Sequence, residues 1–120
     1  DLASHVDWMA DAESIRFSAP STRGLGTTFD CITKVGPFKT VDKMTVVEWV
    51  EARAIAVQHT GLVIGTGRFE LEQRDAGCAL VWTEDLRFPW YLGGPITARA
   101  ARPVLKRIWM GNLRRFAAML

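Results

Sequence analysis

The sequence predicts an α+β fold in which an antiparallel sheet packs against a long C-terminal helix. Residues 13–88 contain short segments of alternating polar and apolar residues separated by turn signals, which is the pattern of a β-meander. After Pro95 the apolar residues recur at helical spacing instead. The 120 residues suit a single domain, so the sheet and the helix must bury their apolar faces against each other.

The expected elements follow from local patterns. Residues 1–12 are short and mildly helical. In "TTFDCITKV" the alternation places Phe29 and Cys31 on one face of a strand. "GPFKT" breaks the strand pattern, and "RDAG" is expected to form a hairpin turn. The six expected strands are residues 13–20, 27–35, 42–50, 54–60, 62–73 and 78–88.

The segment "PITARAARPVLKRIWMGNLRRFAAML" is expected to form one long helix. Pro103 should kink this helix or mark its real start, because proline lacks the N–H that a helix interior requires. The basic residues Arg99, Arg102, Lys106 and Arg114 lie mainly opposite the apolar face. That face is expected to contain Ala101, Val104, Leu105, Ile108, Trp109, Asn112, Leu113 and Phe116.

Composition limits the classes of protein to which the chain can belong. Hydrophobic residues make up 48% of the chain, which is normal for a globular domain. No apolar run approaches the roughly 20 residues that cross a bilayer, so no transmembrane segment is expected. No leader sequence is visible, and two cysteines favour buried, reduced thiols over a disulfide framework. These features favour a cytoplasmic protein.

Charge is unevenly distributed along the chain. Residues 1–94 hold all 13 acidic residues and 9 basic ones, whereas residues 95–120 hold 6 basic residues and no acidic one. The basic segment could contact an acidic partner or a membrane surface, or it could be the solvated outer face of the helix. No basic stripe interleaved with aromatic residues is present, so nucleic-acid binding is not expected.

The stretch "GLVIGTGRFEL", residues 61–71, poses a choice between a phosphate-binding loop and a strand. A dinucleotide-binding loop leads from a strand through its glycines into a helix, but Gly65 and Gly67 are followed by further strand pattern. Being two residues apart, both glycines face the same side and leave a hollow in the side-chain layer. The hollow indicates a strongly curved sheet that wraps the helix, a pocket for a ligand, or both.

Three polar residues fall among apolar ones on faces that are expected to be internal. Glu84 shares a strand face with Trp82, so it is either a paired carboxylate or a pocket acid suited to acid/base catalysis. His59 is either a hydrogen-bonded core residue or a catalytic group, and Asn112 on the inner helix face is equally open. Neither His5 nor His59 has a cysteine or carboxylate at metal-ligand spacing, so no metal site is expected.

Several stretches, taken in order, resemble a known family. They are "DLASHVDWMADAESIRF", "RGLGTTFDC", "VGPF", "EWVEARAIAVQHTGLVIGTGRFEL", "WTEDLRFPWYLGG" and "VLKRIWMGNL". Together they are similar to the SRPBCC superfamily, which includes START domains, Bet v 1-like proteins and polyketide cyclase/dehydrase-like proteins. The small bacterial polyketide cyclase-like proteins are the nearest match. The resemblance covers nearly the whole chain, and the order of the blocks carries it.

The resemblance implies a single helix-grip domain over residues 1–120, in which a curved antiparallel sheet wraps around a long C-terminal helix and leaves a deep hydrophobic cavity. Family members usually begin with a strand and a short helix before the segment that matches "DLASHVDW", so the chain is expected to be N-terminally short. Because an unpaired sheet edge invites pairing with another copy, we expect a homodimer or a swapped strand.

The expected function is the binding of a small hydrophobic ligand, such as a lipid or a polyketide, between the sheet and the C-terminal helix. The chain would act as a carrier or sensor, without a cofactor. One alternative is a polyketide cyclase/dehydratase-like enzyme with Glu84 or His59 as the catalytic acid/base, and a second is a ligand-free interaction module that uses the basic helix face. The predicted ligand-binding residues are Phe29, Trp49, Val57, Val63, Gly65, Gly67, Phe69, Trp82, Leu105, Trp109 and Asn112.

Overall fold

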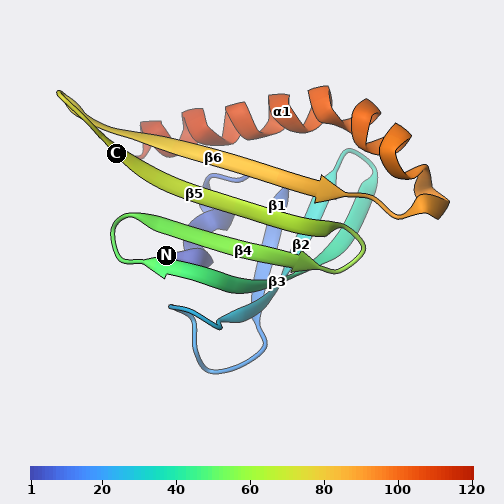
Figure 1. Cartoon of the computed structure of the whole chain (residues 1–120), viewed down its shortest axis with the longest axis horizontal. Coiled ribbons are helices and arrows are strands. Elements are labelled where there is room, and N and C mark those ends of the chain that lie inside the picture. The colour runs from blue at the N-terminus through green and yellow to red at the C-terminus, as the bar shows by residue number, and fades with distance from the viewer.

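The computed structural model describes all 120 residues and consists of one antiparallel sheet followed by a long helix (Figure 1). The six strands lie in sequential order along the sheet, and each pairs antiparallel with the next. The predicted α+β class and the β-meander are confirmed. The elements are η1 (Leu2–Asp7), β1 (Ala12–Phe17), β2 (Thr28–Val35), β3 (Phe38–Val50), β4 (Ala54–Thr60), β5 (Ile64–Arg74), β6 (Gly77–Arg87), η2 (Trp90–Leu92) and α1 (Gly94–Ala118).

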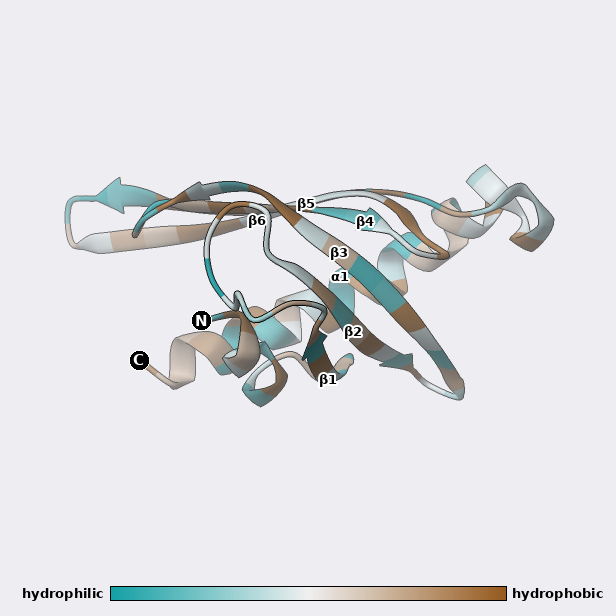
Figure 2. Ribbon diagram, turned by 90° about the horizontal axis from the view of Figure 1, so that it is seen from below, coloured by the Kyte–Doolittle hydropathy of each residue, from teal (hydrophilic) through white to brown (hydrophobic).

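The sheet is curved, and α1 lies on one side of it. Figure 2 shows β2 and β3 running at a steep angle to β5 and β6, with α1 below them. Strand twist accumulates over six strands, and irregular pairing at Ala12/Ser14 and at Val46/Glu48 increases the local bend. The strand closest to the backbone of α1 is β6, while residues 8–11, which precede β1, hold the C-terminal half of the helix. The helix therefore connects the two edges of the sheet.

Two groups of apolar side chains form the core. The first is a small buried cluster of Leu2, Phe29 and Val46. The second is a series of aromatic rings in contact: Trp8, Phe69, Trp82, Trp109 and Phe116. Trp8 is only 4% exposed and touches three of the other rings, so the N-terminal segment is part of the core.

Three local predictions about strands and helix are wrong in detail. The break after β2 is only a two-residue turn, because Phe38 already pairs with Val35. The helix begins at Gly94, so Pro103 does not mark its start but lies inside it, where it leaves one helical hydrogen bond unmade. Val104 is 52% exposed, because the helix faces β6 with the neighbouring stripe that contains Leu105 and Trp109.

No helix has both the length and the apolar character needed to span a membrane.

The two cysteines have different environments. Both are free thiols, and Cys31 is buried on the inner face of β2, where burial is the main cause that raises its pKa to about 11. Cys78 is exposed, which corrects the expectation of two buried thiols. It follows Gly77 at the tip of the β5–β6 hairpin, beyond the part of the sheet that the helix covers.

Asn112 fixes α1 to the N-terminal segment. Its side chain is fully buried, its Nδ2 donates to Asp11 Oδ1 at 2.7 Å, and its Oδ1 accepts from the backbone N–H of Ala10 at 2.9 Å. Arg115, one turn later, donates from Nε to the carbonyl oxygen of Trp8 at 2.9 Å. These contacts lock the rotation of the helix about its own axis.

Asn112→Ala is expected to lower the free energy of unfolding by about 2 kcal/mol, because it leaves the Ala10 N–H and the Asp11 carboxylate without this buried partner. Arg114→Ala is the control, since Arg114 is an exposed residue of the same helix and makes no hydrogen bond or ion pair. Urea denaturation measures both changes. Equal losses in the two variants would show that Asn112 does not anchor the helix.

Candidate functional site

The two glycines of β5 allow side chains from two non-adjacent strands to meet. Directly opposed residues of an antiparallel pair share a face, and Gly65 lies opposite His59 of β4 while Gly67 lies opposite Glu84 of β6. Strands β4 and β6 are two strand spacings apart, about 10 Å. A side chain on β5 would separate the two residues. Without one, His59 Nε2 and Glu84 Oε2 lie 3.4 Å apart.

Each glycine is required for a different reason. A Cβ on Gly67 would lie 2.7 Å from Glu84 Oε1, so this carboxylate occupies the space above the glycine. A Cβ on Gly65 would lie 1.9 Å from the backbone oxygen of Asp85, and Gly65 has a φ of +145°, which other residues rarely adopt. The Glu84 carboxylate therefore occupies the space that the missing side chain of Gly67 leaves.

Asp42, His59 and Glu84 form a buried charged group, which we call the buried triad. His59 Nδ1 lies 3.0 and 3.1 Å from the two carboxylate oxygens of Asp42. Glu84 Oε1 accepts from Trp82 Nε1 at 2.8 Å. The 3.4 Å between His59 Nε2 and Glu84 Oε2 permits charge attraction but lacks hydrogen-bond alignment, so both buried atoms have no hydrogen-bond partner. The triad therefore keeps one donor and one acceptor unused.

The buried triad holds His59 in its protonated form. Burial lowers the pKa of His59, but the hydrogen bond that His59 donates to Asp42 and the contact with Glu84 outweigh this and raise the pKa to about 9. At neutral pH the imidazolium lies between two carboxylates, and Asp42 fixes the orientation of its ring. No cluster of His, Cys, Asp and Glu side chains is arranged to hold a metal ion.

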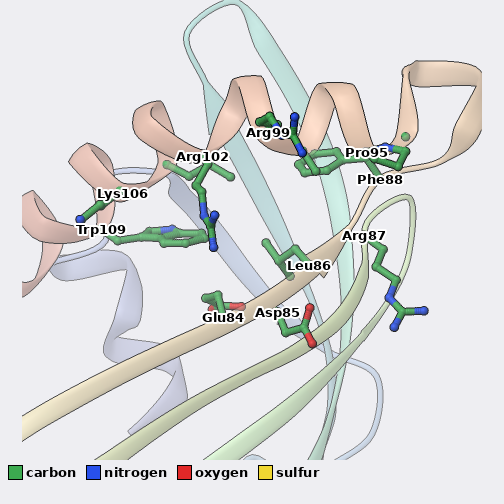
Figure 3. A pocket seen from close by; sticks show the side chains of 13 residues that line it. Glu84, Asp85, Leu86, Arg87, Phe88, Pro95, Arg99, Arg102, Lys106 and Trp109 are labelled. Atoms are coloured by element: carbon green, nitrogen blue, oxygen red, sulfur yellow. The ribbon is translucent and has the colours of Figure 1, made fainter.

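A cavity of about 690 Å³ opens between the C-terminal end of β6 and the first half of α1 (Figure 3). Its strand wall includes Glu84, Leu86 and Phe88, and its helix wall includes Leu105 and Trp109. The Glu84 side chain is 10% exposed, so the buried triad meets the cavity at this residue. We call this space the β6–α1 cavity.

Arg99, Arg102 and Lys106 are exposed, as the prediction of a solvated helix face requires, and they also line the β6–α1 cavity. On a helix, residues three and four apart are neighbours, so Arg102 and Lys106 stand beside the stripe of Leu105 and Trp109. Because α1 spans the opening between the sheet edges, two of its surfaces border the cavity: the inner face and the neighbouring flank that carries the basic residues. Figure 3 shows Arg102 pointing from the helix toward β6, where Glu84 and Leu86 lie.

A second cavity of about 330 Å³ lies near the N-terminus and is separate from the buried triad. Trp49, Phe69 and His5 are among its lining residues. Burial, together with the nearby N-terminal charge, lowers the pKa of His5 to about 4. The lining of this space includes charged residues such as Arg23 and Glu51 as well as aromatic rings, and it carries no unpaired buried polar atom comparable to those of the buried triad.

No protein-family model matches this chain, and no curated protein matches it in sequence. A function must therefore be argued from the chemistry of the site itself.

The structure brings only some of the predicted site residues together. His59 and Glu84 meet in the buried triad, and Trp82 donates to it. Glu84, Leu105 and Trp109 line the β6–α1 cavity, whereas Trp49 and Phe69 line the smaller one.

The remaining predicted residues line neither of these two cavities. Phe29 and Val57 pack in the core, Val63 lies in the turn before β5, and Asn112 anchors the helix. Gly65 and Gly67 lie beneath the contact between His59 and Glu84.

The sequence prediction missed Asp42 and did not identify Arg99, Arg102 and Lys106 as residues that line a cavity. Asp42 alternates with Met44 and Val46, so it was an acidic residue within an apolar row, as Glu84 is. The same signal that identified Glu84 was present for Asp42. No comparable signal exists for Arg99, Arg102 and Lys106. The helical pattern shows which residues share a face, but it does not show beside which flank of the helix β6 leaves a cavity.

Proposed function

We propose that this chain is a helix-grip protein of the SRPBCC superfamily that binds a small hydrophobic ligand in the β6–α1 cavity, as a carrier or sensor. One observation carries the proposal: a solvent-connected cavity of about 690 Å³ has apolar walls on both the sheet and the helix. Ligand sites for small molecules commonly span about 300–1,000 Å³. The order of elements, a six-strand meander followed by a long C-terminal helix, supports the fold part of the proposal.

The walls of the cavity suit a ligand with an apolar body and few polar groups. Leu86 and Phe88 line the space at the C-terminal end of β6, and Leu105 and Trp109 line it from α1. Glu84 contributes a nearly buried carboxylate at the floor of the cavity, and its Oε2 has no hydrogen-bond partner. Apolar residues on both walls would supply affinity through burial, and the charged residues that also line the cavity, Glu84 among them, would supply orientation.

Ala98→Phe is expected to weaken the binding of an apolar probe, because Ala98 lines the cavity and a ring at this position fills it. The probe is N-phenyl-1-naphthylamine, a neutral dye that fluoresces when it enters an apolar site. We expect wild-type protein to bind it and Ala98→Phe to bind at least roughly tenfold more weakly, which corresponds to about 1.4 kcal/mol.

Ala100→Phe is the matched control, because Ala100 is exposed on the same helix and lines neither cavity. Both substitutions change helix propensity equally. The control should bind the dye as wild type does. Absence of dye binding by the wild-type protein, or equal loss in both variants, would contradict the proposed site.

A second candidate is an enzyme that removes a proton next to a carbonyl group, as in polyketide cyclisation. The observation that favours it is the buried triad, in which Asp42 orients His59 and Glu84 reaches the cavity. Glu84, which lines the cavity, would act as the base, and His59 would position its carboxylate through the 3.4 Å contact. Deuterium incorporation into the methyl group of 2-acetonaphthone, followed by NMR, tests this chemistry. Acceleration that Glu84→Gln abolishes without affecting dye binding favours the enzyme, and no acceleration by the wild type opposes it.

We also propose that the protein is cytoplasmic. The free thiol of the exposed Cys78 supports a reducing compartment.

We further propose that the protein forms a homodimer. Strands β1 and β6 are the edges of the sheet, and an edge strand can pair with a second copy. Sedimentation velocity would detect the homodimer as a particle of twice the chain mass, and a single species of chain mass would remove the dimer from the proposal.

A further inference from the structure

Three exposed basic residues on one flank of α1 line the β6–α1 cavity and form no ion pair within the chain. Arg99, Arg102 and Lys106 all line the cavity. None of them takes part in an ion pair, although seven such pairs are present elsewhere in the molecule. An arginine in a cavity wall presents a fork of N–H donors that matches a carboxylate or phosphate. The helix wall is therefore an unused set of donors for an anion.

The acidic residues of the opposite wall do not neutralise this charge. Glu84 is bound to Trp82 and lies against the protonated His59, which supplies its countercharge. Asp85 points away from the helix in Figure 3, as alternation along β6 requires. Arg87 also lines the cavity from β6, so most, but not all, of the unpaired positive charge is on the helix side, next to the apolar stripe of Leu105 and Trp109.

We propose that the ligand of the β6–α1 cavity is an anionic amphiphile, whose acidic group binds Arg102 with support from Arg99 and Lys106. Its apolar body lies against Leu86 and Trp109. The inference rests on the proposed function, since it specifies the ligand class of the same cavity. The candidate ligands have in common a single carboxylate or phosphate on an apolar body. Binding of such a ligand would give a role to the basic residues that are concentrated in the C-terminal segment.

The test compares two dyes that differ by one anionic group. 1-Anilinonaphthalene-8-sulfonate carries a sulfonate, and N-phenyl-1-naphthylamine is the same ring system without it. Wild-type protein is expected to bind the sulfonate dye more tightly. Arg102→Gln should weaken the affinity for the sulfonate dye roughly tenfold, because one charge-assisted hydrogen bond is lost. The affinity for the neutral dye should change by less than about twofold.

Arg107→Gln is the matched control, because Arg107 is an exposed cation of the same helix that does not line the cavity. It removes the same charge and should leave the affinity for both dyes nearly unchanged. If Arg107→Gln weakens the sulfonate dye as much as Arg102→Gln does, general attraction by the basic segment explains the binding, and the proposed anion site is wrong.

The outcomes separate this inference from the proposed function. If neither dye binds, both fail. If both dyes bind equally and Arg102→Gln changes neither, the cavity binds apolar molecules and only the anionic part is overturned. Displacement of the sulfonate dye by dodecanoate or by dodecyl phosphate identifies which acidic group is preferred. Displacement by inorganic phosphate alone, with no advantage for either amphiphile, would contradict the amphiphile assignment.

Discussion

Gly65→Ala is expected to destabilise the protein more than any other single methyl addition in the sheet, by about 4 kcal/mol. Two effects combine at this position. The backbone φ of +145° is strained for any residue with a Cβ, and the added methyl would lie 1.9 Å from the Asp85 backbone oxygen. The obstacle is backbone, so it cannot rotate aside. Urea denaturation of the variant measures the loss.

Gly77→Ala separates the two effects. Gly77 has a similar φ of +139°, but a Cβ there would meet nothing within 4 Å. This variant should therefore lose only the strain contribution, about 1 to 2 kcal/mol. Similar losses for Gly65→Ala and Gly77→Ala would mean that β5 and β6 do not approach as closely as described at Gly65.

The second large effect is a loss of stability with rising pH. The pKa of His59 is about 9 in the folded protein, whereas the ordinary value for a histidine, which applies to the unfolded chain, is 6.5. As the pH rises, the folded state therefore keeps its proton after the unfolded state has released it. The stabilisation is complete below pH 6.5 and disappears as the pH rises through about 9. We expect the free energy of unfolding to fall by about 2 kcal/mol between about pH 7 and about pH 9.

Asp42→Asn is the control for this pH dependence, because it removes the strongest contact that raises the His59 pKa. The variant is less stable overall, but its stability should change much less over the same pH interval. Measurements start near neutral pH because His5, with a pKa lowered to about 4, contributes the opposite dependence in acid. A pH-independent wild type, or an equally steep Asp42→Asn variant, would contradict the protonated state of His59.

The fold could be predicted from the sequence because its signals are local. Alternation in β2 placed Phe29 and Cys31 inside, and both are buried. The change to helical spacing after Pro95 located α1 within one residue of its start at Gly94. Glu84 and His59 were each recognisable as polar residues in apolar rows, because alternation is enough to show which face a residue occupies.

The candidate site could be predicted only in part because it depends on non-local geometry. The contact between His59 and Glu84 requires the register of three strands, and a pattern within one strand does not determine register. The rotation of α1 depends on Asn112, whose partner Asp11 is 101 positions away. The sequence does not reveal this contact, so it could not show that Arg102 lines the cavity.

The central claim is that the β6–α1 cavity receives an apolar ligand, and an NMR titration of the isotope-labelled protein with N-phenyl-1-naphthylamine tests it most directly. The account predicts that amide shifts concentrate in residues 84–88 and 98–109, which line the cavity or connect its lining residues. Shifts centred instead on the smaller cavity around Trp49 and Phe69, or no shifts at saturating dye, would contradict it.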